Sequence, residues 1–256
     1  MNITVIQPDI KWEDKTANFT EIEKLVIPLF NKTDLVILPE MFNTGFSMNP
    51  GALAEAPCMV TYAWMRSISS KGNFGLCGSY IIKDGSVYYN RWVFVSPDGG
   101  TYQYDKRHLF SMGGEDKLFS QGRSRVVFNF RGIRMAPFIC YDLRFPVWSR
   151  NHNDYDLAIY SANWPEVRRN VWRSMLIARA IENQAYVAGS NRIGTDGTGI
   201  RYHGESMIVD PKGEIMAKGD DNKICSVTCT ISPEELESFR QKFPVMNDAD
   251  DFIISL

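Results

Sequence analysis

The sequence predicts an α/β protein in which helices cover two mixed sheets, in a four-layer αββα arrangement. Two observations carry this prediction: apolar strands alternate with amphipathic helices near both ends of the chain, and a run of hairpins lies between them. No low-complexity linker and no short-period repeat divides the chain, so we expect one domain over residues 1–256. A chain of this length buries roughly 70–75% of its unfolded surface, which leaves room for a buried site.

The first half is predicted to hold two strand–helix units and then an antiparallel meander. The expected strands are residues 3–7, 35–38, 75–82, 87–96 and 101–105. The expected helices carry apolar residues at helical spacing, over 22–30 and 60–72. Residues 106–122 show no clear period, and because a loop of this length in a compact domain is usually functional, we predict a lid over a site.

The second half returns to alternating strands and helices. The expected strands are residues 126–130, 133–139, 157–160, 185–189, 205–209, 214–217 and 224–229, with a helix over 171–181. The glycine-rich segment 194–204 lacks the phosphate-binding glycine patterns, so we expect a hairpin loop there. Ser232, Pro233 and Glu235 supply an N-cap, a first-turn proline and a capping-box acid for a last helix that reaches about Phe243.

Charge and composition exclude several kinds of partner. The 28 Lys and Arg nearly balance the 30 Asp and Glu, so no positive field attracts nucleic acid or anionic lipid. No apolar run approaches the ~20 residues of a membrane span, and the N-terminus lacks the basic region of a signal peptide. Five scattered cysteines favour reduced thiols, and we expect a cytoplasmic protein.

Two common kinds of site lack support in the sequence. The three histidines form no His-Glu-x-x-His motif and no close pair, so we expect no metal. Gly-x-Ser-x-Gly is absent, which argues against a serine hydrolase of the nucleophile-elbow type. Cys225 and Cys229 fall on one face of a strand and are best interpreted as two small buried residues.

Three reactive residues each follow a predicted strand: Glu40, Lys106 and Cys140. Taken singly, each has an ordinary structural interpretation, as a solvated acid, a surface lysine and a core cysteine. Strand ends converge on one crevice in sheets covered by helices, so the three could meet. A carboxylate could then take the thiol proton of Cys140, and the ammonium of Lys106 could stabilise a tetrahedral oxyanion. This set predicts acyl transfer without histidine.

At these residues the sequence resembles the nitrilase, or carbon–nitrogen hydrolase, superfamily, whose members carry a Glu-Lys-Cys triad. The resemblance rests on three motifs in order, Leu38-Pro-Glu-Met-Phe42, Tyr104-Asp-Lys-Arg-His-Leu-Phe110 and Ile139-Cys-Tyr-Asp-Leu-Arg-Phe-Pro146. It continues through residues 179–183, 190–192 and 204–207 and covers the chain from Ile3 to Phe252. The family fold is an αββα sandwich that dimerises through helices, so the resemblance also implies a homodimer.

The resemblance implies a role for each matching residue. Glu40 would be the general base, Lys106 the oxyanion stabiliser and Cys140 the nucleophile, with the amide of Tyr141 completing the oxyanion hole. Family members often carry a second glutamate in the loop after the lysine. Glu115 is the candidate here, and its neighbour Asp116 is the residue with which it could be confused.

Within the superfamily, the Cys-Tyr-Asp-Leu-Arg-Phe-Pro string resembles the omega-amidase branch. That branch hydrolyses the terminal amide of short 2-oxo dicarboxylic monoamides such as 2-oxoglutaramate and 2-oxosuccinamate, without a cofactor. Arg144 could bind the distal carboxylate bidentately, or could form a structural ion pair with Asp142 or another acid. We expect apolar pocket walls from Phe46, Met112 and Trp164.

Two alternatives stay open at this point. The same scaffold could act on N-carbamoyl compounds or on a nitrile, because a triad alone does not select the substrate. The chain could also be a catalytically silent binding protein, although all three triad residue types are present.

Overall fold

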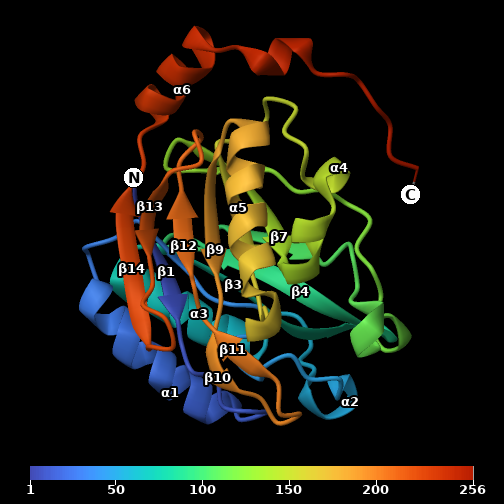
Figure 1. Cartoon of the computed structure of the whole chain (residues 1–256). Coiled ribbons are helices and arrows are strands. Elements are labelled where there is room, and N and C mark those ends of the chain that lie inside the picture. The colour runs from blue at the N-terminus through green and yellow to red at the C-terminus, as the bar shows by residue number, and fades with distance from the viewer. Residues whose placement is uncertain (256) are drawn as a thin grey trace.

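Two six-stranded mixed sheets, packed face to face, form the centre of the computed structural model, which describes residues 1–255 (Figure 1). The first sheet has the spatial order β14 (Cys225–Thr230), β1 (Asn2–Gln7), β2 (Leu35–Ile37), β3 (Gly75–Asp84), β4 (Val87–Val95), β5 (Thr101–Asp105). The second has the order β13 (Ile215–Lys218), β12 (Met207–Val209), β9 (Tyr186–Ser190), β8 (Leu157–Ser161), β7 (Ile133–Ile139), β6 (Phe128–Phe130).

Each sheet has three parallel strands at its centre and antiparallel strands at its margins. Strands β1, β2 and β3 run parallel in the first sheet, and β7, β8 and β9 run parallel in the second. The hairpin neighbours β4, β6 and β12 and the returning strand β14 are antiparallel to them. Parallel strands direct their carboxyl ends to the same edge, so each sheet presents several strand ends together.

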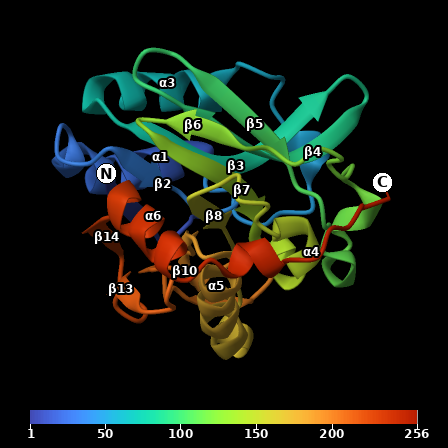
Figure 2. The same cartoon turned by 90° about the horizontal axis from the view of Figure 1, so that it is seen from above.

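Helices cover the outer face of both sheets, so the predicted αββα layering is confirmed (Figure 2). The helices are α1 (Lys15–Val26), α2 (Pro50–Leu53), α3 (Val60–Gly72), α4 (Pro146–Ser149), α5 (Arg169–Asn183) and α6 (Pro233–Lys242). Helices α1 and α3 pack on the first sheet, and α5 packs on the second. Helix α6 lies across one end of the sandwich (Figure 1).

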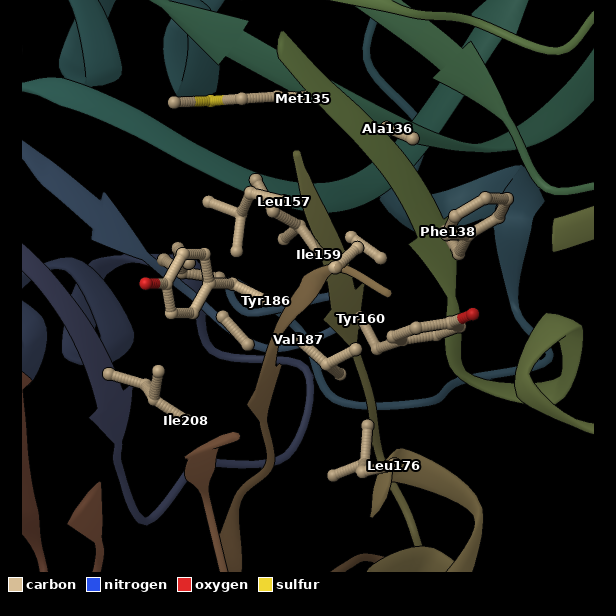
Figure 3. Packing of buried hydrophobic residues seen from close by; sticks show 14 of the residues in the cluster. Met135, Ala136, Phe138, Leu157, Ile159, Tyr160, Leu176, Tyr186, Val187 and Ile208 are labelled. Carbon is tan, nitrogen blue, oxygen red and sulfur yellow. The ribbon is translucent and has the colours of Figure 1, made fainter. Parts of the chain in front are cut away.

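The core consists of one apolar layer between the sheets and others beneath the helices. Strands β7, β8 and β9 are buried on both faces, which explains why their sequences are almost continuously apolar (Figure 3). Inward side chains of the first sheet, such as Trp92 and Phe94, pack against the second sheet. Burial on this scale fixes the strand register and therefore the position of every strand end.

Two helix boundaries, the end of α1 and the start of α6, show how the local sequence determines where a helix ends or begins. The first helix ends at Val26, earlier than its apolar spacing over residues 22–30 predicts, because Pro28 cannot continue it and a 3₁₀ turn over Ile27–Leu29 follows. The last helix begins as predicted, since the hydroxyl of Ser232 accepts the backbone N–H of Glu235 at 3.1 Å.

An ion-pair cluster fastens α6 to the second sheet. The carboxylate of Asp156 accepts hydrogen bonds from Arg134 Nε at 3.0 Å and Nη2 at 2.7 Å, and from Arg240 Nη1 of α6 at 2.8 Å. Arg240 also donates to the carbonyl oxygens of Tyr155 and Gln184. One arginine thus connects the helix to three points of the sandwich.

A short hairpin stands apart from both sheets. It consists of β10 (Ile193–Thr195) and β11 (Arg201–His203), which pair only with each other as strands. Its turn is closed by Asp196, which accepts the backbone N–H of Thr198 and of Ile200. The glycine-rich segment 194–204 therefore forms a hairpin, as predicted from its sequence.

In the described part of the chain, every helix is too short or too polar to span a bilayer.

Candidate active site

The strand ends that precede Glu40, Lys106 and Cys140 meet at one edge of the sandwich. Glu40 follows β2 and Lys106 follows β5 in the first sheet, whereas Cys140 follows β7 in the second. All three line one cavity of about 270 Å³. The site therefore lies between the two sheets, and its parts come from residues 100 positions apart in the sequence.

Lys106 is a buried ammonium held between two carboxylates. Its Nζ lies 2.7 Å from Glu40 Oε1 and 2.9 Å from Glu115 Oε2. Burial opposes the charged form, but the charges of Glu115 and Glu40 overcome it and raise the pKa of Lys106. The lysine is therefore a fixed positive charge at neutral pH.

Glu115 is fully buried within the segment predicted as a lid. Its Oε2 accepts the backbone N–H of Phe110 at 2.7 Å, and both of its oxygens contact Lys106 Nζ. Burial raises the pKa of Glu115, Lys106 opposes that effect, and the nearby Glu40 adds to it. Asp116 is exposed, so the structure separates the two acids that the sequence leaves interchangeable.

Glu40 is held by the segment that follows β8. Its Oε2 accepts the backbone N–H of Asn163 at 3.0 Å, and its carbonyl oxygen accepts Asn163 Nδ2 at 2.5 Å. Ser161 Oγ donates to the carbonyl oxygen of Leu38 at 2.8 Å, which joins the ends of β2 and β8 across the two sheets. The carboxylate is thus fixed by the opposite sheet as well as by its own.

Cys140 occupies a strained turn at the end of β7. Its φ is +42°, in the left-handed region that non-glycine residues rarely adopt, and a 3₁₀ turn over Cys140–Arg144 follows. Burial and the Glu40 carboxylate raise the pKa of the Cys140 thiol well above its usual value, and Lys106 only partly opposes them. The resting side chain is therefore a thiol, which needs a base before it can attack.

Asp142 connects the turn of Cys140 to the segment after Lys106. Its carboxylate accepts Tyr104 Oη at 2.7 Å, the backbone N–H of His108 at 2.9 Å and that of Ile139 at 3.0 Å. Arg144 is not among the partners of this carboxylate, so the alternative of an ion pair between Arg144 and Asp142 is wrong. The hydrogen bonds of Asp142 fix the nucleophile turn relative to the lysine.

Two guanidinium groups lie in the cavity wall over aromatic rings. Arg144 Cζ is 5.2 Å from the ring centroid of Trp164, and Arg168 Cζ is 5.5 Å from that of Phe110. Within residues 1–255, neither arginine has a carboxylate oxygen within 4.0 Å. Both are thus available to an anionic ligand.

The remaining wall residues agree with the sequence prediction in part. Phe46 and Trp164 line the cavity, as does Tyr141. Met112 does not, because it points to solvent from a 3₁₀ turn and is 83% exposed. Met48 and Phe110 provide the apolar surface that was expected from it.

Sequence reasoning missed several residues of the site, among them Asn163, Arg168 and Phe110. Asn163 follows a buried strand just as the triad residues do, and that position was a usable signal. Arg168 ends a 3₁₀ turn and Phe110 lies in a loop, where neither periodicity nor a strand end marks a residue as part of a pocket.

The arrangement brings a base, a fixed cation and a thiol together in one cavity. These are the groups that acyl transfer through a thioester requires, since the carboxylate can accept the thiol proton and the ammonium can stabilise an oxyanion. Neither step needs a metal ion or a histidine.

Comparison with known proteins identifies the family. The model of the carbon-nitrogen hydrolase family matches residues 2–241, which is most of the chain. The chain belongs to the carbon–nitrogen hydrolase family. As a carbon–nitrogen hydrolase, it is an enzyme of the nitrilase superfamily, and the predicted family and fold class are confirmed.

Relatives of this carbon–nitrogen hydrolase match it over nearly their full length. It is 43% identical to the omega-amidase YafV of Escherichia coli, over 98% of each chain. It is 32% identical to the 2-oxoglutaramate amidase of Bacillus subtilis, over 96% of each chain. Among solved structures, XC1258 from Xanthomonas campestris, a superfamily member with an arsenic adduct in its active site, superposes with a TM-score of 0.97 at 37% identity, over 100% of this chain and 99% of that one.

Proposed function

We propose that this carbon–nitrogen hydrolase is an omega-amidase. It hydrolyses the terminal amide of short 2-oxo dicarboxylic monoamides, namely 2-oxoglutaramate and 2-oxosuccinamate, to the 2-oxo acid and ammonia. The observation that carries the proposal is Arg144, a guanidinium in the wall of the triad cavity with no carboxylate partner in the described chain. Full-length relatives that are omega-amidases support the same substrate class.

The first half-reaction forms a thioester and releases ammonia. Cys140 Sγ attacks the amide carbon while Glu40 accepts the thiol proton, which the raised thiol pKa makes necessary. Lys106 and the backbone N–H of Tyr141 stabilise the tetrahedral oxyanion. When the carbon–nitrogen bond breaks, Glu40 returns the proton to the leaving nitrogen.

The second half-reaction regenerates the enzyme. Glu40 takes a proton from water, the resulting hydroxide attacks the thioester carbon, and the thiolate of Cys140 leaves and is protonated by Glu40. Glu115 maintains the charge and position of Lys106 through both halves, since it contacts the ammonium with both oxygens. The reaction needs no cofactor.

Substrate recognition in this proposal is divided between charge and apolar contact. Arg144 binds the carboxylate at the far end of the substrate, where a planar guanidinium matches a carboxylate in two parallel hydrogen bonds. Arg168 adds a second positive charge on the same wall, suited to the 2-oxo group or the same carboxylate. Phe46 and Trp164 enclose the short carbon chain.

The proposed enzyme is a cytoplasmic homodimer that consists of a single domain. The outer surface along α5 is the one we propose for the dimer: Val167, in the 3₁₀ turn before α5, and Ile181, near the end of α5, are 88% and 50% exposed there. Contact with a second chain would bury both apolar side chains. The unpaired cysteines agree with a reducing compartment.

Ammonia release tests the proposal directly. Purified enzyme and a Cys140→Ala variant are compared on 2-oxoglutaramate, 2-oxosuccinamate, glutamine, an N-carbamoyl amino acid and a simple nitrile. We expect release from the two 2-oxo amides by the wild type alone. Activity confined to the N-carbamoyl compound or the nitrile would assign a different reaction to the same triad. Activity that survives in Cys140→Ala would overturn the nucleophile.

A further inference from the structure

Asn90 is a buried asparagine on the inward face of β4, next to the two carboxylates of the site. Its neighbours on that face of the strand, Trp92 and Phe94, belong to the apolar core between the sheets. Burial of an amide at such a position is unfavourable unless its hydrogen bonds are made. We therefore expect the amide of Asn90 to form hydrogen bonds with specific partners at this position.

The side chain of Asn90 bridges both carboxylates. Its Nδ2 donates to Glu40 Oε1 at 2.8 Å and to Glu115 Oε1 at 3.1 Å, which uses both of its N–H groups. Carboxylates only accept hydrogen bonds, so the NH₂ end of the amide must face them. Within residues 1–255, no other side chain besides Lys106 forms hydrogen bonds with both acids.

A short relay fixes the other end of the amide. Ser79 Oγ, on the neighbouring strand β3, donates to Asn90 Oδ1 at 2.8 Å. The same hydroxyl accepts the backbone N–H of Met41 at 3.0 Å, immediately after Glu40 in the chain. This chain of hydrogen bonds runs from the backbone N–H next to Glu40, through Ser79 and Asn90, to the carboxylate of Glu40 itself.

The charges of the site explain why two further donors are needed. Glu40 and Glu115 share one ammonium, so the cluster carries one more negative than positive charge when both acids are ionised. Two negative charges that share one counter-ion favour protonation of one of the two acids. Two N–H donors aimed at the two acids oppose that protonation without adding a charge that would repel Lys106.

We propose that Asn90 is a positioning residue, which holds Glu40 and Glu115 around Lys106 and, through its two N–H donors, favours the ionised form of this pair of acids. This role rests on the proposed function of Glu40 as general base. It does not depend on which amide is the substrate.

The test replaces the amide by an apolar group of similar size. Asn90→Leu removes both donors, and Asn151→Leu is the matched control. Asn151 is equally buried and makes comparable hydrogen bonds away from the cavity. Its Nδ2 donates to the carbonyl oxygens of Tyr155 and Asn183, and its Oδ1 accepts the backbone N–H of Asp154. Both variants lose stability, and only the first alters the acids of the site.

Two readouts separate positioning from mere loss of stability. The first is the pH profile of kcat/KM on whichever amide the wild type hydrolyses. The second is the rate at which iodoacetamide alkylates Cys140 between pH 5 and 9, followed by peptide mass spectrometry. For Asn90→Leu we expect kcat to fall about 100-fold with KM changed less than threefold. We expect the acidic limb of both profiles to move up by about one pH unit.

The Asn151→Leu control keeps the wild-type acidic limb in both profiles. If Asn90→Leu does not fold, Ser79→Ala removes only the hydroxyl that orients the amide, and we expect the same shift at roughly half the size. Unmoved acidic limbs in the folded Asn90 or Ser79 variant would overturn the proposal. An enzyme that hydrolyses none of the amides would refute the omega-amidase function, whereas the alkylation profile would still decide the role of Asn90.

Discussion

The guanidinium of Arg144 lies over the indole ring of Trp164, with 5.2 Å between Cζ and the ring centroid. The ring holds the cation in the cavity wall and leaves its N–H groups free for an anion. We expect Arg144→Met to lower kcat/KM on 2-oxoglutaramate by about 30–1,000-fold, because a charge-assisted bidentate contact contributes roughly 2–4 kcal/mol. We expect most of this loss to appear as an increase in KM in steady-state kinetics.

Arg144→Lys is the informative companion. A lysine keeps the charge but cannot make two parallel hydrogen bonds, so it restores less than a tenth of the lost activity. A simple aliphatic amide without a carboxylate serves as the control substrate, and both variants hydrolyse it at the wild-type rate. Equal losses on both substrates would place Arg144 in the chemistry or in the fold and not in recognition.

Glu115→Gln tests the second acid. The amide keeps the shape of the side chain but removes one of the two negative charges beside Lys106. Its NH₂ group would also face one of the two donors that now bond to Glu115, Lys106 Nζ or the backbone N–H of Phe110. We expect kcat to fall about 100-fold with little change in KM. Asp116→Asn, the same substitution on the exposed neighbouring residue, keeps full activity. Comparable losses in the two variants would contradict the assignment of Glu115.

The pKa shifts predict a broad alkaline plateau. The pKa of the Cys140 thiol is raised, and that of Lys106 is raised by its two carboxylates against the effect of burial, so neither group loses its proton between pH 7 and 9. We therefore expect kcat/KM to stay level across this range in a series of overlapping buffers. A transition near pH 8.5, the value of an ordinary cysteine, would show that the thiol is less shielded than the geometry indicates.

Asp156→Asn tests the attachment of α6. Burial opposes ionisation of Asp156, but hydrogen bonds from Arg134 and the charge of Arg240 lower its pKa. A depressed folded-state pKa stabilises the protein above the unfolded value of about 4, and this stability is lost as the pH falls through the folded pKa. We expect the variant to lose about 1–3 kcal/mol at pH 7, with unchanged kcat. Urea unfolding at pH 7 and pH 3.5 measures the loss in the free energy of unfolding, and we expect a smaller loss at the lower pH. An equal loss at both pH values would exclude the charge of Asp156 as its source.

The fold was largely predictable because its signals are local. Fully buried strands such as β8 appear as short apolar runs, and Ser232 marks the start of α6 by its own capping chemistry. The strand ends after which Glu40, Lys106 and Cys140 occur were visible for the same reason. That these three meet depends on sheet order, which strand spacing alone does not give.

The polar network around the triad was not predictable in the same way. Asn90 lies on the inward face of β4 beside the aromatic residues Trp92 and Phe94, and its role depends on Glu115, which lies 25 residues further along the chain. Met112 was wrongly placed in the wall because its type suits an apolar pocket, whereas the 3₁₀ turn over Ser111–Gly113 directs it to solvent. Such details depend on three-dimensional neighbours and on loop geometry, which side-chain type does not determine.

The hairpin of β10 and β11 contributes Asp196, Thr198, Ile200 and Tyr202 to the cavity wall, yet it belongs to neither large sheet. Substitutions in its turn can therefore reshape the cavity wall while the strands that precede the base, the lysine and the thiol stay unchanged. The substrate range can thus change independently of the catalytic groups.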